Sequence, residues 1–466
     1  MKSRFLALLG VVGATQALAV ERPNIIFILA DDMGYGDVSC FNDNKLVMTP
    51  NIDRLAKRGV RMTQAYVYPV SAPTRASFLT GSQGHEIGVY GNSDSDVPGV
   101  GQERNSFTPE LQKLGYSTAW FGKWHQGYDV ASHPLNNGFD RAYGFLGGMH
   151  DYYDAKEGNF YNGGPYSQYA HIYDDFTPVK QMGYITEEVT QHAIDFIEEN
   201  LHDPFYIYLA YNAPHTPLQA PEETVLKYLR QGCDAISATR YAMIDVMDAQ
   251  IGLLLNTLKE NEIDENTLVI FMSDNGPELE VNSGGYRGHK FTLWEGGVRT
   301  PLIASLPGVI PQGIESNSMC GIYDMATTIL TLANGEATSF GTGKDLMPYF
   351  KRERVDNVRD SFIIANHPNN HRMPYTHSSM NLLLVRMGEW KYVKDVALNE
   401  LALYNIESDP SERENLYDMH PEIVKELLEY ADQVLETTPI SSAMGFQSHM
   451  SKTREQAHIT RYKQYE

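Results

Sequence analysis

Short apolar runs alternate along the chain with longer segments in which apolar residues recur at helical intervals. The apolar runs end abruptly in polar residues, and we predict that they are buried strands over residues 24–30, 117–122, 205–211 and 267–273. Helices are predicted beside them over residues 50–58, 109–114, 186–200 and 237–261. Continuous apolar strands separated by helices are typical of a mostly parallel sheet that is buried on both faces. The pattern therefore predicts an α/β fold with a large sheet between layers of helices.

The pattern changes near residue 350, where a charged stretch covers residues 351–360. Three strand-like runs follow, at residues 361–366, 381–387 and 389–395. A helix is then predicted from about Pro421 to Leu435. Strands that follow one another without helices between them indicate a small antiparallel sheet with one covering helix. We therefore predict a main domain over residues 20–350 and a smaller α+β subdomain over residues 351–466.

The composition is that of a globular protein with a strongly acidic balance. Of the 466 residues, 42% are hydrophobic, which is enough for a core, and the formal net charge is −22. This charge disfavours nucleic acid and anionic membranes as partners, because both are bound through basic surface. The three cysteines, Cys40, Cys233 and Cys320, allow at most one disulfide and have no zinc-ligand spacing.

The first 19 residues resemble a secretory signal peptide. Lys2 and Arg4 precede a short apolar run over residues 5–12, and the small residues Ala17 and Ala19 mark a cleavage site. The run is too short to span a bilayer, and no other stretch of about 18 apolar residues follows it. We therefore predict an exported protein without a membrane span, either periplasmic or secreted.

Reactive or ligating side chains follow each of the predicted strands. They are Asp31 and Asp32 after the first, Lys123 and His125 after the second, His215 after the third, and Asp274 and Asn275 after the fourth. Because ligands of an open parallel sheet bind beyond the carboxyl ends of its strands, we expect these side chains to meet at one edge. Three carboxylates and an amide carbonyl are hard oxygen ligands that suit Ca²⁺ or Mg²⁺ better than zinc. Unscreened carboxylates would repel one another, so a divalent cation is the natural compensation.

Three cations are expected around this metal site, namely Lys123, Lys290 and Arg75. Cations beside a metal indicate an anionic substrate, whose oxygens they share with the metal. Pro73 is predicted to be the first residue of a helix, which places Ser71 just before a helix N-terminus. Free N–H groups at such an end favour an anion.

Several segments resemble the type I sulfatases, and they occur in the order of that family across nearly the whole mature chain. They are Asp31-Asp32, SAPTRASFLTG at residues 71–81, GYSTAWFGKWH at 115–125, NAPH at 212–215, SDNG at 273–276, RGHKFTLWEGGVRTP at 287–301 and LYNIESDPSERENLYD at 403–418. The resemblance implies an alkaline-phosphatase-like α/β fold and hydrolysis of a sulfate ester. It also implies that Ser71 is oxidised to formylglycine (3-oxoalanine), which for a serine precursor is the work of a radical-type maturase.

The resemblance further implies a cofactor and a role for each residue. One Ca²⁺ would be bound by Asp31, Asp32, Asp274, Asn275 and the modified Ser71. One hydroxyl of the hydrated aldehyde would attack sulfur, and the other, deprotonated by His125, would then expel sulfate. Lys123 and Arg75 would hold these hydroxyls. His215 and Lys290 would face the leaving alcohol, with His215 as the general acid.

A sulfated sugar is the expected substrate, because an exported sulfatase with a serine precursor is similar to carbohydrate sulfatases of gut bacteria. We expect an exo-acting enzyme on mucin or glycosaminoglycan sugars. Candidate substrate-binding residues are His150 and Asp151, beside a tyrosine-rich segment, and His371 and Arg372 in the C-terminal subdomain. Tyrosines that pack within their own loop, and a plain polar turn around His371, are the simpler explanations.

Two other functions stay open on the sequence alone. One is a phosphatase or phosphodiesterase of the same superfamily, and the other is a non-catalytic protein that binds sulfated glycans. Such phosphatases commonly use two metals, whereas ligands for one are found here. A binding protein would have no use for an acid and a base.

Overall fold

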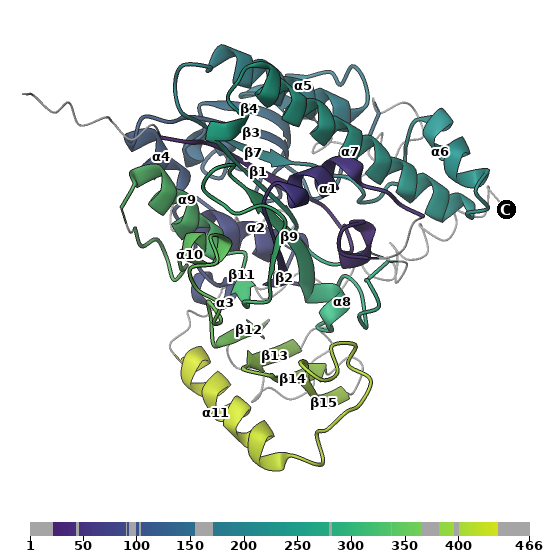
Figure 1. The fold of residues 1–466 in the computed structure, drawn as a ribbon, viewed down its shortest axis with the longest axis vertical. Coiled ribbons are helices and arrows are strands. Elements are labelled where there is room, and N and C mark those ends of the chain that lie inside the picture. The colour runs from purple at the N-terminus through teal and green to yellow at the C-terminus, as the bar shows by residue number, and fades with distance from the viewer. Residues whose placement is uncertain are drawn as a thin grey trace, which may run out of the picture.

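The computed structural model describes residues 22–42, 46–89, 91–92, 99–101, 104–153, 171–278, 282–336, 338–365, 382–395 and 400–436. A large sheet carries helices on both faces, and a smaller sheet with one helix lies below it (Figure 1). The strands of the large sheet are β1 (Asn24–Ala30), β2 (Val60–Tyr66), β3 (Ser117–Lys123), β4 (Arg141–Phe145), β5 (Ile172–Asp174), β6 (Thr177–Val179), β7 (Phe205–Ala210), β8 (Thr267–Ser273), β9 (Arg299–Ser305), β10 (Ile314–Ser316) and β11 (Cys320–Gly321). The helices of this part are α1 (Pro50–Lys57), α2 (Ser71–Thr80), α3 (Gly84–Ile87), α4 (Thr108–Lys113), α5 (Ile185–Glu199), α6 (Glu222–Leu229), α7 (Ala235–Glu260), α8 (Glu295–Val298), α9 (Asp324–Asn334) and α10 (Met347–Phe350).

The order of the strands brings the four predicted strands together. It reads β10-β2-β9-β8-β1-β7-β3-β4-β5-β6, with β11 also paired to β2. Strands β8, β1, β7 and β3 are consecutive neighbours, and each pair among them is parallel. The prediction of a large, mostly parallel sheet is therefore confirmed. Strand β9 differs, because it runs antiparallel to both β2 and β8.

Burial on both faces explains why the central strands are mainly apolar. In β1, the Phe27 ring stacks on Phe78 of α2, with ring centroids 4.1 Å apart. The next residue, Ile28, belongs to a second core that includes Ile244 of α7. Successive side chains of a strand point to opposite faces, so a sheet between two layers of helices needs apolar residues throughout. Helices α2, α4 and α9 form one layer, and α1, α5 and α7 form the other.

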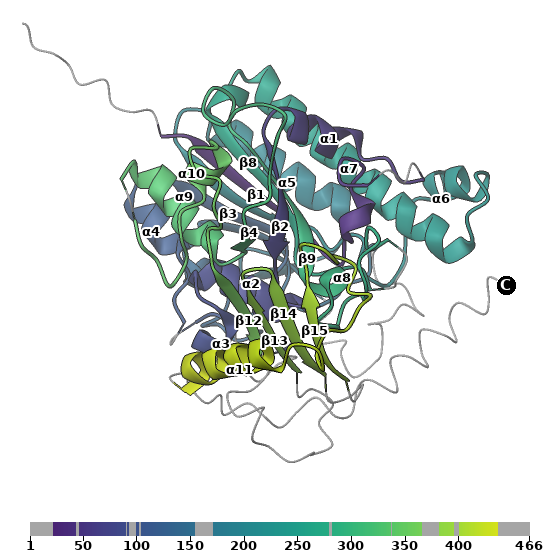
Figure 2. The ribbon, with the colours of Figure 1, turned by 60° about the horizontal axis from the view of Figure 1, so that its bottom comes forward.

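The smaller sheet is antiparallel, in the order β12-β13-β14-β15, and α11 covers one of its faces (Figure 2). Its elements are β12 (Ser361–Ala365), β13 (Leu382–Met387), β14 (Trp390–Asp395), β15 (Glu400–Asn405) and α11 (Pro421–Glu436). Leu403 is buried in one core with Leu427 of α11. Leu384, on the other face, is buried with Tyr66 of β2 and Trp294 beside α8. The prediction of a small antiparallel sheet with one covering helix is confirmed, and β15 is a fourth strand that the prediction did not include.

Helix α1 begins at Pro50 as predicted, but the side chain of Thr49 does not cap it. Asp248 of α7 accepts hydrogen bonds from the backbone N–H groups of Asn51 (3.1 Å) and Ile52 (2.9 Å) instead. Burial raises the pKa of Asp248 to about 6. A carboxylate at a helix N-terminus satisfies the free N–H groups there, so α7 both covers the sheet and fixes the start of α1.

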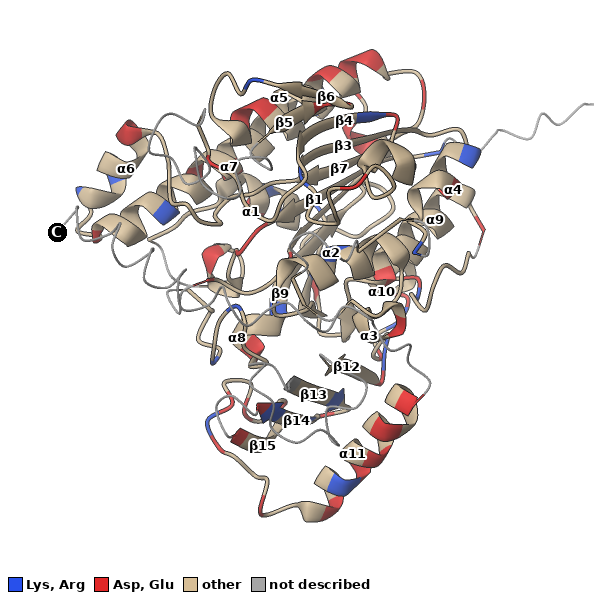
Figure 3. Ribbon diagram, turned by 180° about the vertical axis from the view of Figure 1, so that it is seen from behind, with Lys and Arg blue, Asp and Glu red and all other residues tan. Residues whose placement is uncertain are grey.

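Acidic residues lie along the outer surfaces of α5 and α11, as Figure 3 shows. Exposed examples are Glu187 and Glu198 on α5 and Glu422 and Glu426 on α11. Each of the three cysteines is a free thiol, so the allowed disulfide does not form. Within the described ranges, no helix combines the length and apolar character needed to cross a bilayer.

Candidate active site

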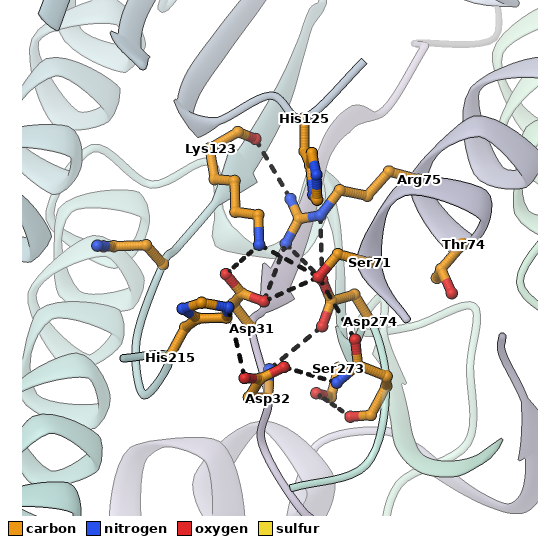
Figure 4. Close-up of polar contacts among 12 residues, drawn as sticks. Asp31, Asp32, Ser71, Thr74, Arg75, Lys123, His125, His215, Ser273 and Asp274 are labelled. Carbon is orange, nitrogen blue, oxygen red and sulfur yellow. Dashed lines mark hydrogen bonds and ion pairs between the residues drawn. The ribbon is translucent and has the colours of Figure 1, made fainter. Parts of the chain in front are cut away.

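The residues expected at the strand ends lie together in the structure (Figure 4). Asp31 and Asp32 follow β1, Lys123 ends β3, His215 lies in the turn after β7, and Asp274 follows β8. They meet because these four strands are neighbours in the sheet. Asp32 has a φ of 62°, a left-handed conformation that residues other than glycine seldom adopt. The turn thereby directs two successive carboxylates into one site.

Ser71 follows strand β2, which is not one of these four strands. It is the first residue of α2, whereas the sequence predicted a place just before the helix. Its Oγ accepts a hydrogen bond from Lys123 Nζ at 3.1 Å. It lies 3.2 Å from Asp31 Oδ1 and 3.4 Å from Asn275 Oδ1, so it can donate to either. Ser71 is almost fully buried. The hydroxyl therefore stands at a helix N-terminus with oxygen acceptors on one side and a cation on the other.

Each carboxylate of the site is paired with its own cation. Lys123 Nζ lies 2.6 Å from Asp31 Oδ2, Lys290 Nζ lies 2.8 Å from Asp32 Oδ2, and Arg75 Nη2 lies 2.8 Å from Asp274 Oδ2. These side chains are at most 3% exposed, so water screens the pairs little. The three cations that the sequence placed around the site therefore lie directly against its carboxylates.

The three carboxylates differ in the direction in which their pKa values are shifted. Burial and the nearby charge of Asp274 raise the pKa of Asp31 to about 8. Burial has the same effect on Asp32, but Lys290 and His215 outweigh it and lower the pKa of Asp32. Burial likewise opposes ionisation of Asp274, and Arg75 and Lys123 nevertheless lower its pKa.

His125 faces the site with an uncommitted imidazole. Its backbone is left-handed, with a φ of 57°, and both ring nitrogens are buried with no hydrogen-bond partner among the described residues. A Cβ at Gly148 would lie 2.6 Å from His125 Nε2, so only glycine allows the ring this place. Burial and the positive charges of Lys123 and Arg75 hold the pKa of His125 well below its usual value. A neutral imidazole with free nitrogens can accept a proton.

His215 is oriented by its own turn. Its Nδ1 lies 2.6 Å from the carbonyl oxygen of Thr216, so Nδ1 is the donor and a neutral ring carries its lone pair on Nε2. Nε2 lies 3.6 Å from Asp32 Oδ2. Burial and Lys290 hold the pKa of His215 well below its usual value, although Asp32 acts in the opposite direction.

Oxygen donors for a metal ion surround Ser71. The carboxylates of Asp31 and Asp32 and the His215 imidazole offer ligand atoms that all lie within 4.8 Å of one another. The Asn275 amide carbonyl and the second oxygen of Asp274 lie on the same side. The carboxylate and amide oxygens are the hard ligands that Ca²⁺ prefers, so the residues present fit this ion. The His215 imidazole offers a nitrogen atom and is therefore not counted as a ligand of this ion, because a Ca²⁺ site is built from oxygens.

Asp37 and Arg240, which the sequence reasoning missed, support this site from behind. Arg240 Nη1 donates to Asp37 Oδ1 at 2.8 Å, and its Nη2 donates to the backbone carbonyl of Asp32 at 3.2 Å. Asn282, in the loop that leads to Lys290, donates to the same Asp37 oxygen at 2.9 Å. Asp37 therefore connects α7, the turn after β1 and the loop of Lys290. An arginine on the apolar stripe of α7, one turn before Ile244, was the signal in the sequence.

The substrate-binding candidates are placed only in part. His150 and Asp151 are buried, and Asp151 Oδ1 accepts a hydrogen bond from Gln219 at 2.9 Å. The adjacent Tyr152 hydroxyl donates to the backbone carbonyl of His215 at 2.9 Å. This segment therefore packs against the His215 turn rather than against the carboxylates. His371 and Arg372, and residues 154–170 of the tyrosine-rich segment, lie outside the described residues.

Comparison with known proteins agrees with this geometry. Residues 23–335 match the family model described as Sulfatase. The chain belongs to the sulfatase family. Residues 285–437 of this sulfatase also match the model described as N-sulphoglucosamine sulphohydrolase, C-terminal.

Several relatives are similar over most of their length. N-acetylgalactosamine-6-sulfatase of Mus musculus is 33% identical over 376 residues, which cover 74% of this chain and 69% of the relative. The arylsulfatase of Klebsiella aerogenes is 27% identical over 451 residues, covering 72% of this chain and 92% of the relative. The crystal structure of Ps i-CgsB in complex with k-i-k-neocarrahexaose has a TM-score of 0.81 and 29% identity, and covers 96% of this chain and 100% of that one.

These likenesses confirm the alkaline-phosphatase-like fold that the resemblance implied. The sulfatase is an enzyme, a sulfuric ester hydrolase. They favour this activity over the phosphatase and over the non-catalytic binding protein that the sequence left open.

Proposed function

We propose that this sulfatase removes sulfate from sugars, as an exo-acting O-sulfatase on glycans of the mucin or glycosaminoglycan type. The mouse relative is named for a sulfated N-acetylgalactosamine, and the Ps i-CgsB crystal holds k-i-k-neocarrahexaose. The C-terminal family model is likewise named for a sulfated sugar. Sulfate release from defined sulfated monosaccharides, and not only from polymers, tests both the sugar and the exo mode of action.

The environment of the Ser71 oxygen carries the proposal. A single hydroxyl, at the first residue of a helix, contacts Lys123, Asp31 and Asn275 and is buried with them. A helix N-terminus and two lysines favour an anionic group, such as a sulfate ester, at this position. The carboxylates beside it would repel the same anion unless a cation lay between them.

We assign Asp31, Asp32, Asp274, Asn275 and the modified Ser71 as the ligands of one Ca²⁺. The ion would lower the pKa of a hydroxyl bound to it and polarise the sulfate oxygens. The charges support this assignment. Burial raises the pKa of Asp31 to about 8, so a bound Ca²⁺ would favour the ionised carboxylate. A sulfate ester and an ionised nucleophile, each with one negative charge, would offset the rest of the charge of the ion. Ca²⁺ and the substrate therefore belong together in the site.

Ser71 itself would be converted to formylglycine, whose hydrated form supplies two hydroxyls on one carbon: one as nucleophile and one through which sulfate is later released. Lys123 and Arg75, fixed by Asp31 and Asp274, would hold these hydroxyls in place. His125 would accept the proton from the second hydroxyl, because its ring nitrogens have no partner among the described residues and its lowered pKa keeps the ring neutral.

The leaving alcohol would lie beside His215 and Lys290. A neutral His215 cannot donate from Nε2, but an anion bound within about 4–6 Å raises the pKa of an imidazole. The sulfate ester would counteract the effect of Lys290 on His215, and the protonated imidazole would then act as general acid, while Lys290 stays a cation beside Asp32. A sugar alkoxide leaves poorly, so this proton could matter by about 10²–10⁴ in rate.

Conversion of Ser71 tests the mechanism. The sulfatase should be expressed with and without a radical-type maturase, and the mass of the peptide around Ser71 should be measured beside sulfate release. We expect the peptide to lose two hydrogens only with the maturase, and activity to rise in proportion. Ser71→Ala should be inactive in both hosts. Robust turnover by protein whose Ser71 is wholly unmodified contradicts the proposal.

Two further proposals concern residues that the structure does not describe, residues 1–19 and Arg372. Export would remove residues 1–19, so the N-terminus of the mature protein should begin after Ala19 when the chain is secreted by a bacterial host. The C-terminal subdomain, residues 351–466, would contribute Arg372 to the substrate pocket. Arg372→Ala should then raise KM for a glycan sulfate and leave an aryl sulfate nearly unaffected.

A further inference from the structure

Phe291 occupies a backbone position that is normally reserved for glycine. Residues 289–292 form a tight turn, in which the Thr292 N–H donates to the His289 carbonyl at 3.0 Å. Phe291 is the third residue of this turn and has a φ of 72°. Turns with a positive φ at this position take glycine or asparagine, and an aromatic residue there is strained.

The turn is fixed on several sides, which keeps the strained conformation in place. The Thr292 side chain donates to the His289 carbonyl at 2.6 Å and accepts from the His289 N–H at 3.0 Å. The Phe291 N–H donates to the carbonyl of Pro69 at 2.8 Å, two residues before Ser71. Strain that its surroundings enforce in this way is a feature of functional sites.

The Phe291 ring contributes little to the packing of the fold. The residue is 51% exposed and belongs to none of the four buried cores. Glycine would therefore be the better residue for stability alone. A role in packing does not explain why phenylalanine stands here.

The ring lies beside the leaving-group side of the active site. Lys290 Nζ is 5.3 Å from the centroid of the Phe291 ring and 2.8 Å from Asp32 Oδ2. The same ammonium therefore lies beside both the ring and a carboxylate of the site. A ring within about 6 Å of an ammonium is oriented by it. An exposed aromatic face held next to the place of the leaving alcohol is suited to the C–H face of a sugar ring.

We propose that Phe291 is a specificity-determining residue of this sulfatase, whose ring forms a platform for the apolar face of the pyranose that carries the sulfate. The inference rests on the proposed function, because it requires a sugar on the leaving-group side. The backbone strain at residue 291 is then the cost of holding an aromatic ring at the mouth of the site.

Phe291→Gly is the decisive variant, because it removes the ring and relieves the strain together. With the maturase-converted enzyme, KM for N-acetylgalactosamine 6-sulfate should rise about tenfold while kcat stays within about twofold of wild type. The inhibition constant of inorganic sulfate should not change, because the free ion does not extend to the ring. The melting temperature should rise or stay level. Phe291→Tyr, which keeps the ring, should retain most of the wild-type KM.

Phe176→Ala is the matched control, since Phe176 is 52% exposed and lies between β5 and β6 at the far edge of the sheet. It should leave KM unchanged. An unchanged KM in Phe291→Gly overturns the platform. An equal rise in KM and in the sulfate inhibition constant also overturns it, and makes the ring a shield for Lys290. If wild-type enzyme with converted Ser71 releases sulfate from an aryl sulfate but from no sulfated sugar, the proposed function fails, and the platform fails with it.

Discussion

Two of the clusters of buried charged side chains in the described part of the chain can be compared, and only one of them has the properties of a catalytic site. The first is the proposed active site around Ser71. The second, the interface cluster, consists of Glu295 of α8, Lys391 of β14 and Glu412. Lys391 Nζ lies 2.8 Å from Glu295 Oε1 and 2.7 Å from Glu412 Oε1, and the three side chains are almost fully buried. This cluster joins the smaller sheet to the main part of the molecule.

The two clusters differ in whether they contain a reactive group without a hydrogen-bond partner. In the interface cluster, each of the three charged groups is occupied by another group of the protein. Glu295 also accepts from the Tyr66 hydroxyl at 2.8 Å, and Glu412 accepts from the Glu295 N–H at 2.6 Å. In the active site, a hydroxyl contacts both a lysine and carboxylates, and the His125 imidazole nearby has no partner among the described residues. Burial of charge alone therefore does not identify catalysis; an oxygen nucleophile and a free base beside the charges do.

The largest effect is expected from Asp274→Ala, which removes a proposed Ca²⁺ ligand and the partner of Arg75. Sulfate release should fall below detection, and Ca²⁺ should no longer raise the melting temperature. Asp324→Ala is the matched control, since Asp324 is also fully buried and pairs with an arginine, Arg359, at 2.5 Å. It should lower stability but keep the response to Ca²⁺. Equal loss of the Ca²⁺ response in both variants would show that Asp274 is structural.

Chelation tests the same site in the unaltered chain. Treatment with a strong calcium chelator should abolish turnover, and added Ca²⁺ should restore it, because the ion is proposed to activate the nucleophile. The measurement is sulfate release before chelation, after it and after Ca²⁺ is returned. Full activity after exhaustive chelation would falsify the assignment of a calcium ion.

Lys391→Met should have the opposite profile, with a large cost in stability and little in chemistry. It leaves Glu295 and Glu412 buried without their shared cation, and removal of one partner from a buried ion pair costs about 3–5 kcal/mol. The free energy of unfolding from urea titration measures this cost, and kcat should be compared at a temperature where the variant is folded. The triple variant Lys391→Met, Glu295→Gln and Glu412→Gln should recover part of the loss. A collapse of kcat in folded Lys391→Met contradicts the division between the two clusters.

His215→Ala separates two kinds of leaving group. Hydrolysis of a sugar sulfate should slow by about a hundredfold or more, whereas an aryl sulfate should slow much less, because a phenoxide leaves without protonation. His192→Ala is a suitable control, since His192 stacks on Tyr143 with ring centroids 3.7 Å apart, on the α5 side of the sheet. Equal losses on both substrates would remove His215 from the role of general acid.

The parts of the site that the sequence predicts are those set by strand ends. Runs such as residues 24–30 and 267–273 are buried at every position, and their interior positions are apolar, because both faces of the sheet are covered. Such runs show where a parallel strand ends, so Asp31 and Asp274 could be placed at one edge before any coordinates. Asp31 and Asp274 then lie close together because β8 and β1 are neighbours in the sheet.

The parts that the sequence does not predict depend on contacts between distant segments. The sequence does not predict strand β9, because the strand begins with Arg299 and contains Pro301, and strand propensity alone does not favour it. The charge balance of the site requires knowing that Lys123 meets Asp31, 92 residues away. Arg240 supports Asp32 across 208 residues, and only its place on an apolar helix face hinted at burial. Pairings of this kind follow from the tertiary fold.

The smallest expected effect concerns the pH dependence of the interface cluster. Burial, reinforced by Glu295, raises the pKa of Glu412 from 4.5 to about 7. Between these two pH values the folded state holds a proton that the unfolded state has released, so the free energy of unfolding falls as pH rises through this window. A shift of this size corresponds to at most about 3 kcal/mol, and the charge shared with Lys391 and Glu295 reduces it. The opposite shift of Glu295, whose pKa is lowered to about 2 against the effect of burial by Lys391, acts below pH 4.5 and leaves this window unaffected.

Glu412→Gln should therefore match wild type near pH 5 and become the more stable protein by about 1–2 kcal/mol at pH 8. Urea unfolding at several pH values between 5 and 8 measures the difference. Glu414→Gln, an exposed position in the same segment, should follow the wild-type curve at every pH. Parallel curves for wild type and Glu412→Gln would mean that Glu412 is ionised throughout, held so by Lys391 against burial and the charge of Glu295. The interface cluster would then hold two ionised carboxylates beside one lysine, and the hydroxyl and the imidazole without a partner would be what distinguishes the proposed active site from it.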